Sequence, residues 1–141
     1  MRFFFALWPP AATAATLAAW AGQAQTLTGG KPTPGQAIHL TLAFLGEVSE
    51  NRIQDAIRAA RNVRGAPHAL PIELAKVWAH NSIVWAGPER TPPALDSLAS
   101  ALRAQLQAEG FAIEARPFAP HVTLVRKAHR APRLPPLPAA P

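Results

Sequence analysis

Apolar and polar residues alternate along the stretch AIHLTLAFLG, which spans residues 37–46. Such alternation predicts a strand with two unlike faces, because successive side chains of a strand point to opposite sides of a sheet. The apolar face, which we expect to meet the core, consists of Ile38, Leu40, Leu42 and Phe44. The other face carries His39 and Thr41, an imidazole and a hydroxyl side by side.

The same pattern returns near the end of the chain, in the stretch APHVTLVRKA at residues 119–128. Here His121 and Thr123 share one face, and Val122 and Leu124 share the other. A single His-x-Thr on a strand is weak evidence, because most strand histidines have no chemical role. Two copies in matched surroundings are a much stronger signal.

The surroundings of the two motifs match as a weak internal repeat. In each half of the chain, a strand (FFALWPP, IVWAGPERTPP) leads to a pair of prolines, a helix, a loop and then a strand with the His-Thr pair. Repeated units usually bury their faces against each other. Two units related by a local two-fold axis would bring both pairs to one central cleft.

The remaining elements follow from the same patterns and from capping residues. We expect strands at 2–8, within 68–80, at 82–87 and at 111–118, and a hairpin turn at His80-Asn81. A first helix should run from the Pro9-Pro10 pair to about Gln25. A second helix should cover 49–63, with Ser49 as its cap. A third helix should begin at Pro92-Pro93, with Thr91 as its cap, and stop at Gly110. The basic, Pro-rich chain at 128–141 should be an extended or disordered tail after a single domain at 1–127.

Composition narrows the chemistry. The 141 residues include no cysteine, which excludes thiolate catalysis and disulfides and fits a reducing compartment such as the cytoplasm. The net charge of +6, supplied mostly by arginine, favours polyanionic partners such as RNA or phosphate esters, although a biased genome composition would produce the same excess. No apolar stretch is long enough for a membrane span, and Pro9 and Pro10 argue against a cleaved signal peptide.

The paired motifs suit acid–base chemistry on a phosphate. Two histidines that titrate near neutral pH can serve as base and acid, and neighbouring hydroxyls can donate to phosphate oxygens. Arg126 adds a positive charge after the second motif, but simple alternation places it on the face opposite His121 and Thr123, so it must lie past the regular strand or at a bulge to reach them. No carboxylate lies within either motif, and we expect no metal or other cofactor.

The segments RFFFALWPP, HLTLAFLGEV and RPFAPHVTLVRKA resemble the 2H phosphoesterase superfamily, and within it the RNA 2′,3′-cyclic phosphodiesterases, also called 2′-5′ RNA ligases. The resemblance implies an α+β fold of two pseudo-symmetric lobes, each a small antiparallel sheet with helices, around a cleft. It implies that His39 protonates the leaving ribose oxygen and that His121 activates water. Thr41, Thr123 and Arg126 would hold the cyclic phosphate.

Three alternatives remain open at this stage. The chain is an enzyme that opens 2′,3′-cyclic phosphates of RNA or nucleotides, a non-catalytic RNA- or nucleotide-binding module, or a 2H enzyme for another cyclic nucleotide or 2′-5′ oligonucleotide. Ligation of RNA ends is a possible side activity of the first.

Family members usually continue with two more strands, so we expect an exposed sheet edge here, through which a homodimer could form. The four tryptophans are expected in the core rather than as base-stacking platforms, and one of Phe4 and Phe5 is a weaker candidate for stacking. We assign no role to His68, His80 and His129.

Overall fold

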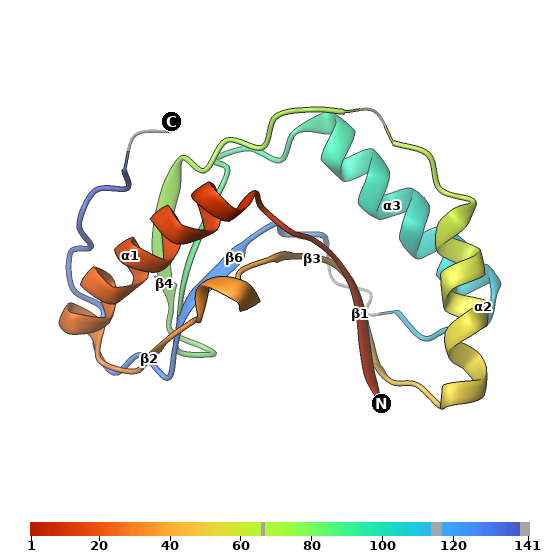
Figure 1. Ribbon diagram of the computed structural model, residues 1–141, viewed down its shortest axis with the longest axis horizontal. Coiled ribbons are helices and arrows are strands. Elements are labelled where there is room, and N and C mark those ends of the chain that lie inside the picture. Colours follow the sequence, from red (N-terminus) through yellow and green to blue (C-terminus); the bar gives the residue numbers. More distant parts are fainter. Residues whose placement is uncertain (66, 114–116, 139–141) are drawn as a thin grey trace. The chain divides into compact units, whose positions relative to one another are not determined.

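The computed structural model describes residues 1–65, 67–113 and 117–138. The elements follow one another along the chain as β1 (Arg2–Leu7), α1 (Ala11–Thr28), β2 (Lys31–Pro32), the 3₁₀ turn η1 (Gly35–Ala37), β3 (Leu40–Glu47), α2 (Glu50–Arg61), β4 (Leu74–Trp78), β5 (Ile83–Gly87), α3 (Pro93–Ala108) and β6 (Val122–Arg126) (Figure 1). The strands are hydrogen-bonded in the order β1-β3-β6-β5-β4, and β2 also pairs with β6. The expected α+β class is confirmed.

The chain divides into two compact units, each with its own strands and helices. Unit 1 consists of residues 1–6, 41–70 and 90–120, and unit 2 of residues 7–40, 71–89 and 121–141. Each unit therefore takes segments from both halves of the sequence repeat. The strand β3 passes from one unit to the other, with Leu40 in unit 2 and the rest of the strand in unit 1.

Unit 2 is built around β6, which pairs with β5 along one side and with Leu40 and β2 along the other. The hairpin β4–β5 is fully antiparallel, from Leu74 opposite Gly87 to Trp78 opposite Ile83. Helix α1 packs against β6, β2 and η1 (Figure 1). The buried apolar side chains between helix and strands are Leu17, Trp20, Ala21, Ala24, Val84, Ala86, Val122, Leu124 and Val125.

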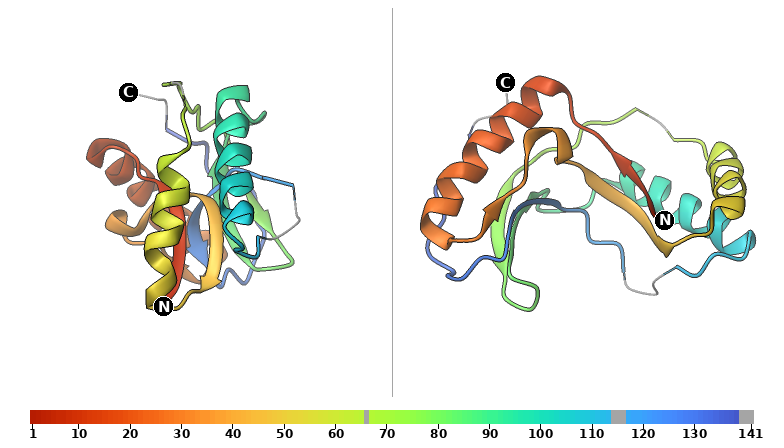
Figure 2. Two further views of the ribbon diagram at one scale, coloured as in Figure 1. Left: turned by 90° about the vertical axis from the view of Figure 1, so that its right-hand side faces the viewer. Right: turned by 60° about the horizontal axis from the view of Figure 1, so that its bottom comes forward.

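Unit 1 holds most of β1 and of β3, together with the helices α2 and α3, which lie side by side (Figure 2). Its core consists of Leu42, Ala43, Val48, Ala56, Ala59, Leu95, Ala99, Leu102 and Leu106. Polar contacts add to this packing: Arg103 Nε donates to the carbonyl oxygen of Leu42 at 3.2 Å, which ties α3 to β3.

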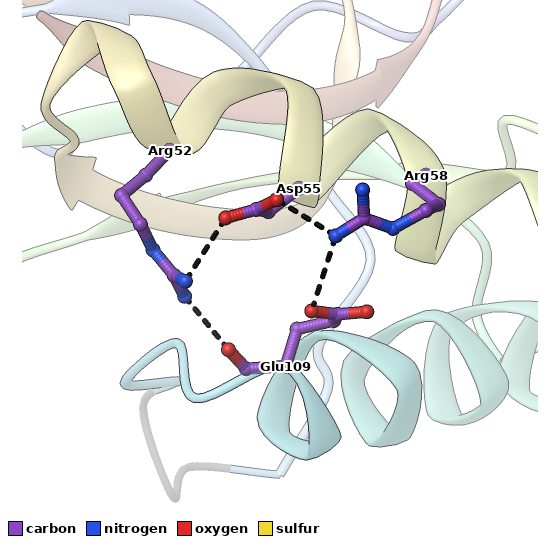
Figure 3. Close-up of polar contacts among 4 residues, drawn as sticks. All are labelled: Arg52, Asp55, Arg58 and Glu109. Carbon is purple, nitrogen blue, oxygen red and sulfur yellow. Dashed lines mark hydrogen bonds and ion pairs between the residues drawn. The ribbon is translucent and has the colours of Figure 1, made fainter.

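A group of charged side chains joins α2 to the end of α3 (Figure 3). Asp55 accepts from Arg52 at 3.0 Å and from Arg58 at 2.7 Å, one bond on each carboxylate oxygen. Arg52 also donates to the carbonyl oxygen of Glu109 at 2.7 Å, and Arg58 lies 3.7 Å from the Glu109 carboxylate. Arg52 and Arg58 of α2 therefore both contact Glu109, the residue that caps the C-terminal end of α3.

The helices begin and end close to where the sequence predicted. Helix α1 continues to Thr28, beyond the expected Gln25, and ends where Gly29 adopts a positive φ of 72° and its N–H donates to the carbonyl of Gln25. The prediction of a Thr91 cap for α3 is wrong. The N-cap is Pro92, whose carbonyl accepts the first helical bond from Asp96, and Pro93 fits the first turn because its missing N–H has no partner to lose there.

The strand predictions hold with three differences. The two-residue strand β2 was not expected from its Gly- and Pro-rich sequence. Residues 111–113 of the strand expected at 111–118 form no strand, and residues 114–116 of it lie outside the described residues. Phe44, expected in the core, is 44% exposed, because two consecutive residues, Leu42 and Ala43, are buried and the alternation of β3 shifts there. The guanidinium of Arg2 lies over the Phe44 ring, 5.3 Å from its centroid.

The chain after β6 forms no helix or strand at residues 128–138, but it is held against unit 2. The backbone N–H groups of His129 and Arg130 donate to the carbonyl of Thr28 at the end of α1. Further along, the indole Nε1 of Trp20 donates to the carbonyls of Pro135 and Pro136 at 3.3 and 3.1 Å. The described part of the tail therefore follows α1.

Candidate active site

His39 lies between the turn η1 and β3, immediately before the first strand residue, Leu40. Its Nδ1 lies 2.7 Å from the carbonyl oxygen of Ala37. A carbonyl oxygen only accepts hydrogen bonds, so Nδ1 must carry a proton in this contact. The other ring nitrogen, Nε2, is therefore the position where a proton can be gained or lost. The ring is half-buried and lies against the indole of Trp8, with ring centroids 5.0 Å apart.

His121 stands at the start of β6, in the same unit as His39. Two tryptophans of the hairpin β4–β5 surround its ring. Trp78 contacts it edge-on with centroids 4.7 Å apart, and the Trp85 centroid lies at 6.4 Å. Edge-to-face contacts are a favourable geometry for aromatic rings, so these indoles contribute to holding the imidazole.

The pairing of β3 and β6 relates the two histidines. Leu40 lies opposite Val122 in an antiparallel register, and both side chains are buried. If this register continues by one residue, His39 lies opposite Thr123, on the face away from Leu40. His121 is then the diagonal neighbour of His39, at about 7–8 Å between backbones. Unit 2 contains His39, His121 and Thr123, and Thr41 belongs to unit 1.

Arg126 returns to this face through an irregularity in β6. Trp85 lies opposite Thr123, but the preceding residue, Val84, lies opposite Val125, so Leu124 is an extra residue in the ladder. Such a bulge reverses the alternation after it. Val125 consequently shares the buried side of Val84, and Arg126 points to the side of Thr123. The burial agrees, because Leu124 and Val125 are both 0% exposed, whereas Arg126 is exposed.

Contacts from the segment after β2 hold the bulge in place. The backbone N–H of Thr33 donates to the carbonyl of Leu124 at 2.8 Å, and the Thr33 hydroxyl donates to the carbonyl of Thr123 at 3.0 Å. The two backbone carbonyls beside the extra residue are thereby satisfied. The sequence predicted that Arg126 needed a bulge, or a position past the regular strand, to reach the face of the histidines, and the register provides the bulge.

The tryptophans are divided between core and surface, which the sequence did not predict. Trp20 and Trp85 are buried, as expected. Trp8 is 58% exposed and contacts His39, whereas Trp78 is half-buried and contacts His121. Only the repeat itself offered a signal for Trp8, which directly precedes the proline pair. Nothing in the spacing marked Trp78.

Two further observations concern metal binding and membrane spans. Across residues 1–65, 67–113 and 117–138, no three His, Asp or Glu side chains are grouped in a way that would hold a metal ion. None of the helices in the described part of the chain combines the length and apolar character that a membrane crossing requires.

Comparison with known proteins first defines a class, the phosphoesterases. A family model described as LigT like Phosphoesterase matches residues 7–85 and 86–140. The chain belongs to this LigT-like phosphoesterase family, which confirms the resemblance seen in the sequence.

Two relatives and one solved structure show what this chain is similar to. The RNA 2′,3′-cyclic phosphodiesterase of Escherichia coli (strain K12) is 36% identical over 96% of this chain and 77% of its own length. The protein of the same name from Thermus thermophilus is 31% identical over 97% of this chain and 74% of its own. Among solved structures, E. coli LigT complexed with 3′-AMP has a TM-score of 0.89 at 35% identity, covering 97% of this chain and 79% of that one.

Proposed function

We propose that this protein is an enzyme that hydrolyses 2′,3′-cyclic phosphates of RNA or nucleotides to 2′-phosphates. Family membership and the names of its relatives support this reaction. The observation that carries the mechanism is the placement of His39 and His121 in one unit, at the starts of two strands paired through Leu40 and Val122.

In the proposed mechanism His121 acts as the general base. It removes a proton from a water molecule, whose oxygen attacks the phosphorus atom. The bond from phosphorus to the ribose O3′ then breaks, and its electron pair stays on O3′. His39 donates the proton on Nε2 to this oxygen, so the products are a 2′-phosphate and a free 3′-hydroxyl.

His39 suits the acid role because the carbonyl of Ala37 holds its Nδ1–H, which leaves Nε2 as the proton donor when the ring is charged. Thr41, Thr123 and Arg126 are proposed to bind the phosphate oxygens. An arginine there stabilises the extra negative charge of the transition state, where it is worth more than in the ground state.

Incubation with 2′,3′-cyclic nucleotides and with short RNAs that end in a cyclic phosphate tests this proposal. The expected product carries its phosphate on the 2′ oxygen, which chromatography against 2′- and 3′-phosphate standards identifies. Binding of both substrates without turnover would indicate a non-catalytic module. Turnover only of 2′-5′ oligonucleotides or another cyclic nucleotide would indicate a different 2H substrate, and joining of RNA ends would reveal ligase activity.

We also propose that two copies can associate through β4. This strand ends the hydrogen-bonded order, and no strand pairs with its outer side in the described part of the chain. Its unpaired backbone groups offer a template for a second copy.

A further inference from the structure

A pocket of about 330 Å³ in unit 2 lies at the end of β6 that is remote from His121. It is lined by Lys31, Asn81, Ile83, Arg126 and Lys127. Four chain segments contribute to it: β2, the β4–β5 turn, β5 and the end of β6. None of the roles proposed above uses Lys31, Asn81 or Lys127.

The pairing registers place three of the lining residues on the Thr123 side of β6. Lys31 lies opposite Arg126 in the β2–β6 ladder, and residues directly opposite in a ladder point to the same side. The bulge at Leu124 places Arg126 on the side of Thr123. Ile83, two residues before Trp85 in a regular strand, shares that side as well.

The charge of the pocket is uniformly positive. Three of its five lining residues are cationic and none is acidic. Within the described residues, no carboxylate forms an ion pair with Lys31, Arg126 or Lys127. Three neighbouring like charges repel one another, so a bound anion would relieve an unfavourable interaction as well as add attraction.

The backbone fixes the lysines in their places. Gly30 approaches the end of β6 so closely that a Cβ on it would lie 2.3 Å from the carbonyl oxygen of Arg126, and its φ of +88° also favours glycine. Lys127 has a positive φ of 56°, and the following N–H, of Ala128, donates to the carbonyl of Ser82. The backbone beneath the pocket is therefore held by the fold, and the exposed side chains of Lys31 and Lys127 extend from it.

We infer that this pocket binds a phosphodiester of the RNA chain upstream of the cyclic phosphate. The inference rests on the proposed function and adds to it a second contact site, which an RNA chain would reach and a cyclic mononucleotide would not. The rise of a strand places Arg126 about 15 Å from His121 along the backbone. Lys127 lies one residue beyond Arg126, and Lys31 lies opposite Arg126 on β2, so the pocket extends the positive charge beyond the proposed phosphate ligand. We place the preceding nucleotides of a single strand there. Arg126, with its long side chain, stands between the two positions.

The test compares a double variant, Lys31→Gln with Lys127→Gln, against the unchanged protein on two substrates. On a 2′,3′-cyclic mononucleotide, kcat/KM should stay the same. On an RNA oligonucleotide that ends in a cyclic phosphate, kcat/KM should fall about tenfold through a higher KM, as expected for two exposed phosphate contacts. A matched control, Arg61→Gln with Arg64→Gln, removes the same charge from unit 1 and should leave both values unchanged.

Binding of an RNA that already ends in a 2′-phosphate separates this inference from the proposed function. The slope of log K against log salt should lessen by about 1.4 in the lysine variant, because each of the two lysines that binds a phosphate of a single strand accounts for about 0.7 of that slope. Added inorganic phosphate should compete only weakly, because the site recognises the phosphate as part of a chain.

The possible outcomes are distinct. An inactive wild type whose RNA binding still depends on the lysines would overturn the hydrolase and retain the RNA site. If the wild type is active but kcat/KM of the lysine variant falls equally on both substrates, or does not fall on RNA, the RNA site is wrong and the proposed hydrolase activity stands. Inorganic phosphate that competes as well as RNA would also overturn the RNA site alone.

Discussion

The hydrogen bond of His39 bears on its proposed role. The carbonyl oxygen of Ala37 can only accept, so the 2.7 Å contact favours a ring with a proton on Nδ1. Nε2 is then the atom that can donate to the leaving ribose oxygen, and this supports the acid role that we propose for His39.

The two histidines should act as one unit. We expect His39→Ala and His121→Ala each to lower kcat by about 10²–10⁴-fold, the usual range for general acid–base catalysis. The double variant should be little worse than either single one, because one proton transfer is of little use without the other. Steady-state rates on a cyclic nucleotide, with circular dichroism to show an intact fold, provide the measurement. A folded variant that lacks either histidine and keeps a near-normal rate would contradict the mechanism.

Activity should not depend on a metal ion. The acid–base pair supplies both proton transfers, and neither His-x-Thr motif carries a carboxylate. After extensive dialysis against EDTA the rate should be unchanged, and the pH profile of kcat should be bell-shaped. Lost activity that a divalent ion restores would argue for a metal-assisted reaction instead.

At the residue scale, the sequence predicted the histidines and threonines because alternation is a local property. The burial agrees at both motifs, where Leu40 and Val122 are buried and His39 and His121 are half-buried. The exposed Trp8 and the position of Trp78 beside His121 could not be predicted in this way. Both depend on which distant strand lies next to the motif, and this information is absent from local spacing.

At the scale of elements, the bulge in β6 shows how far a sequence argument reaches. Alternation showed that Arg126 would need an irregularity or a position past the strand, but it could not locate the extra residue. That residue is set by Thr33, whose two hydrogen bonds to the carbonyls of Thr123 and Leu124 come from a distant segment. Similarly, β2 exists because Lys31 and Pro32 lie beside β6, although their own sequence favours a loop.

The charged cluster between α2 and α3 should stabilise unit 1. Asp55→Ala removes the carboxylate that holds both Arg52 and Arg58, and its side chain is only 24% exposed. We expect the free energy of unfolding to fall by about 1 kcal/mol, the upper range for partly exposed ion pairs. Urea denaturation at low salt measures this loss.

High salt provides the control for this effect. At 1 M salt the loss should shrink, because screening weakens the ion pairs that the variant lacks. Asp96→Ala, which removes an acidic residue of α3 outside the cluster, gives a matched comparison. A loss for Asp55→Ala that is equally large at both salt concentrations would indicate a packing defect rather than an electrostatic one.

At the scale of the whole molecule, the repeat predicted two units but not how the chain divides between them. Each half supplies one long helix, yet α1 belongs to unit 2 and α3 to unit 1, while β3 continues from one unit into the other. The reason is that β3 and β6, from different halves, pair with each other at Leu40 and Val122. Pairing between halves is a long-range choice that hydrophobic spacing alone does not reveal.

The tail and β4 line the same cavity. A cavity of about 830 Å³ lies in unit 2, lined by residues 72–77 on one side and by the tail residues 131, 132 and 134–138 on the other. The tail is rich in proline, which cannot donate to a ladder, so it lines this side of β4 without completing the sheet. We therefore expect it to limit, but not prevent, the association of two copies through β4.

Loosening the tail should increase that association. Trp20→Phe keeps an aromatic ring in the core but removes the indole N–H that binds the carbonyls of Pro135 and Pro136. Light scattering over a range of concentrations should show more dimer for Trp20→Phe than for the unchanged protein. Thr16→Ala, which alters α1 without touching the tail, should behave like the unchanged protein. A β-hairpin designed to pair with β4 and appended to the C-terminus should give the opposite result, a monomer with a higher melting temperature, since paired strands would satisfy the edge of β4. If all of these proteins are monomeric at every concentration and the appended hairpin leaves the melting temperature unchanged, the proposed dimer is wrong.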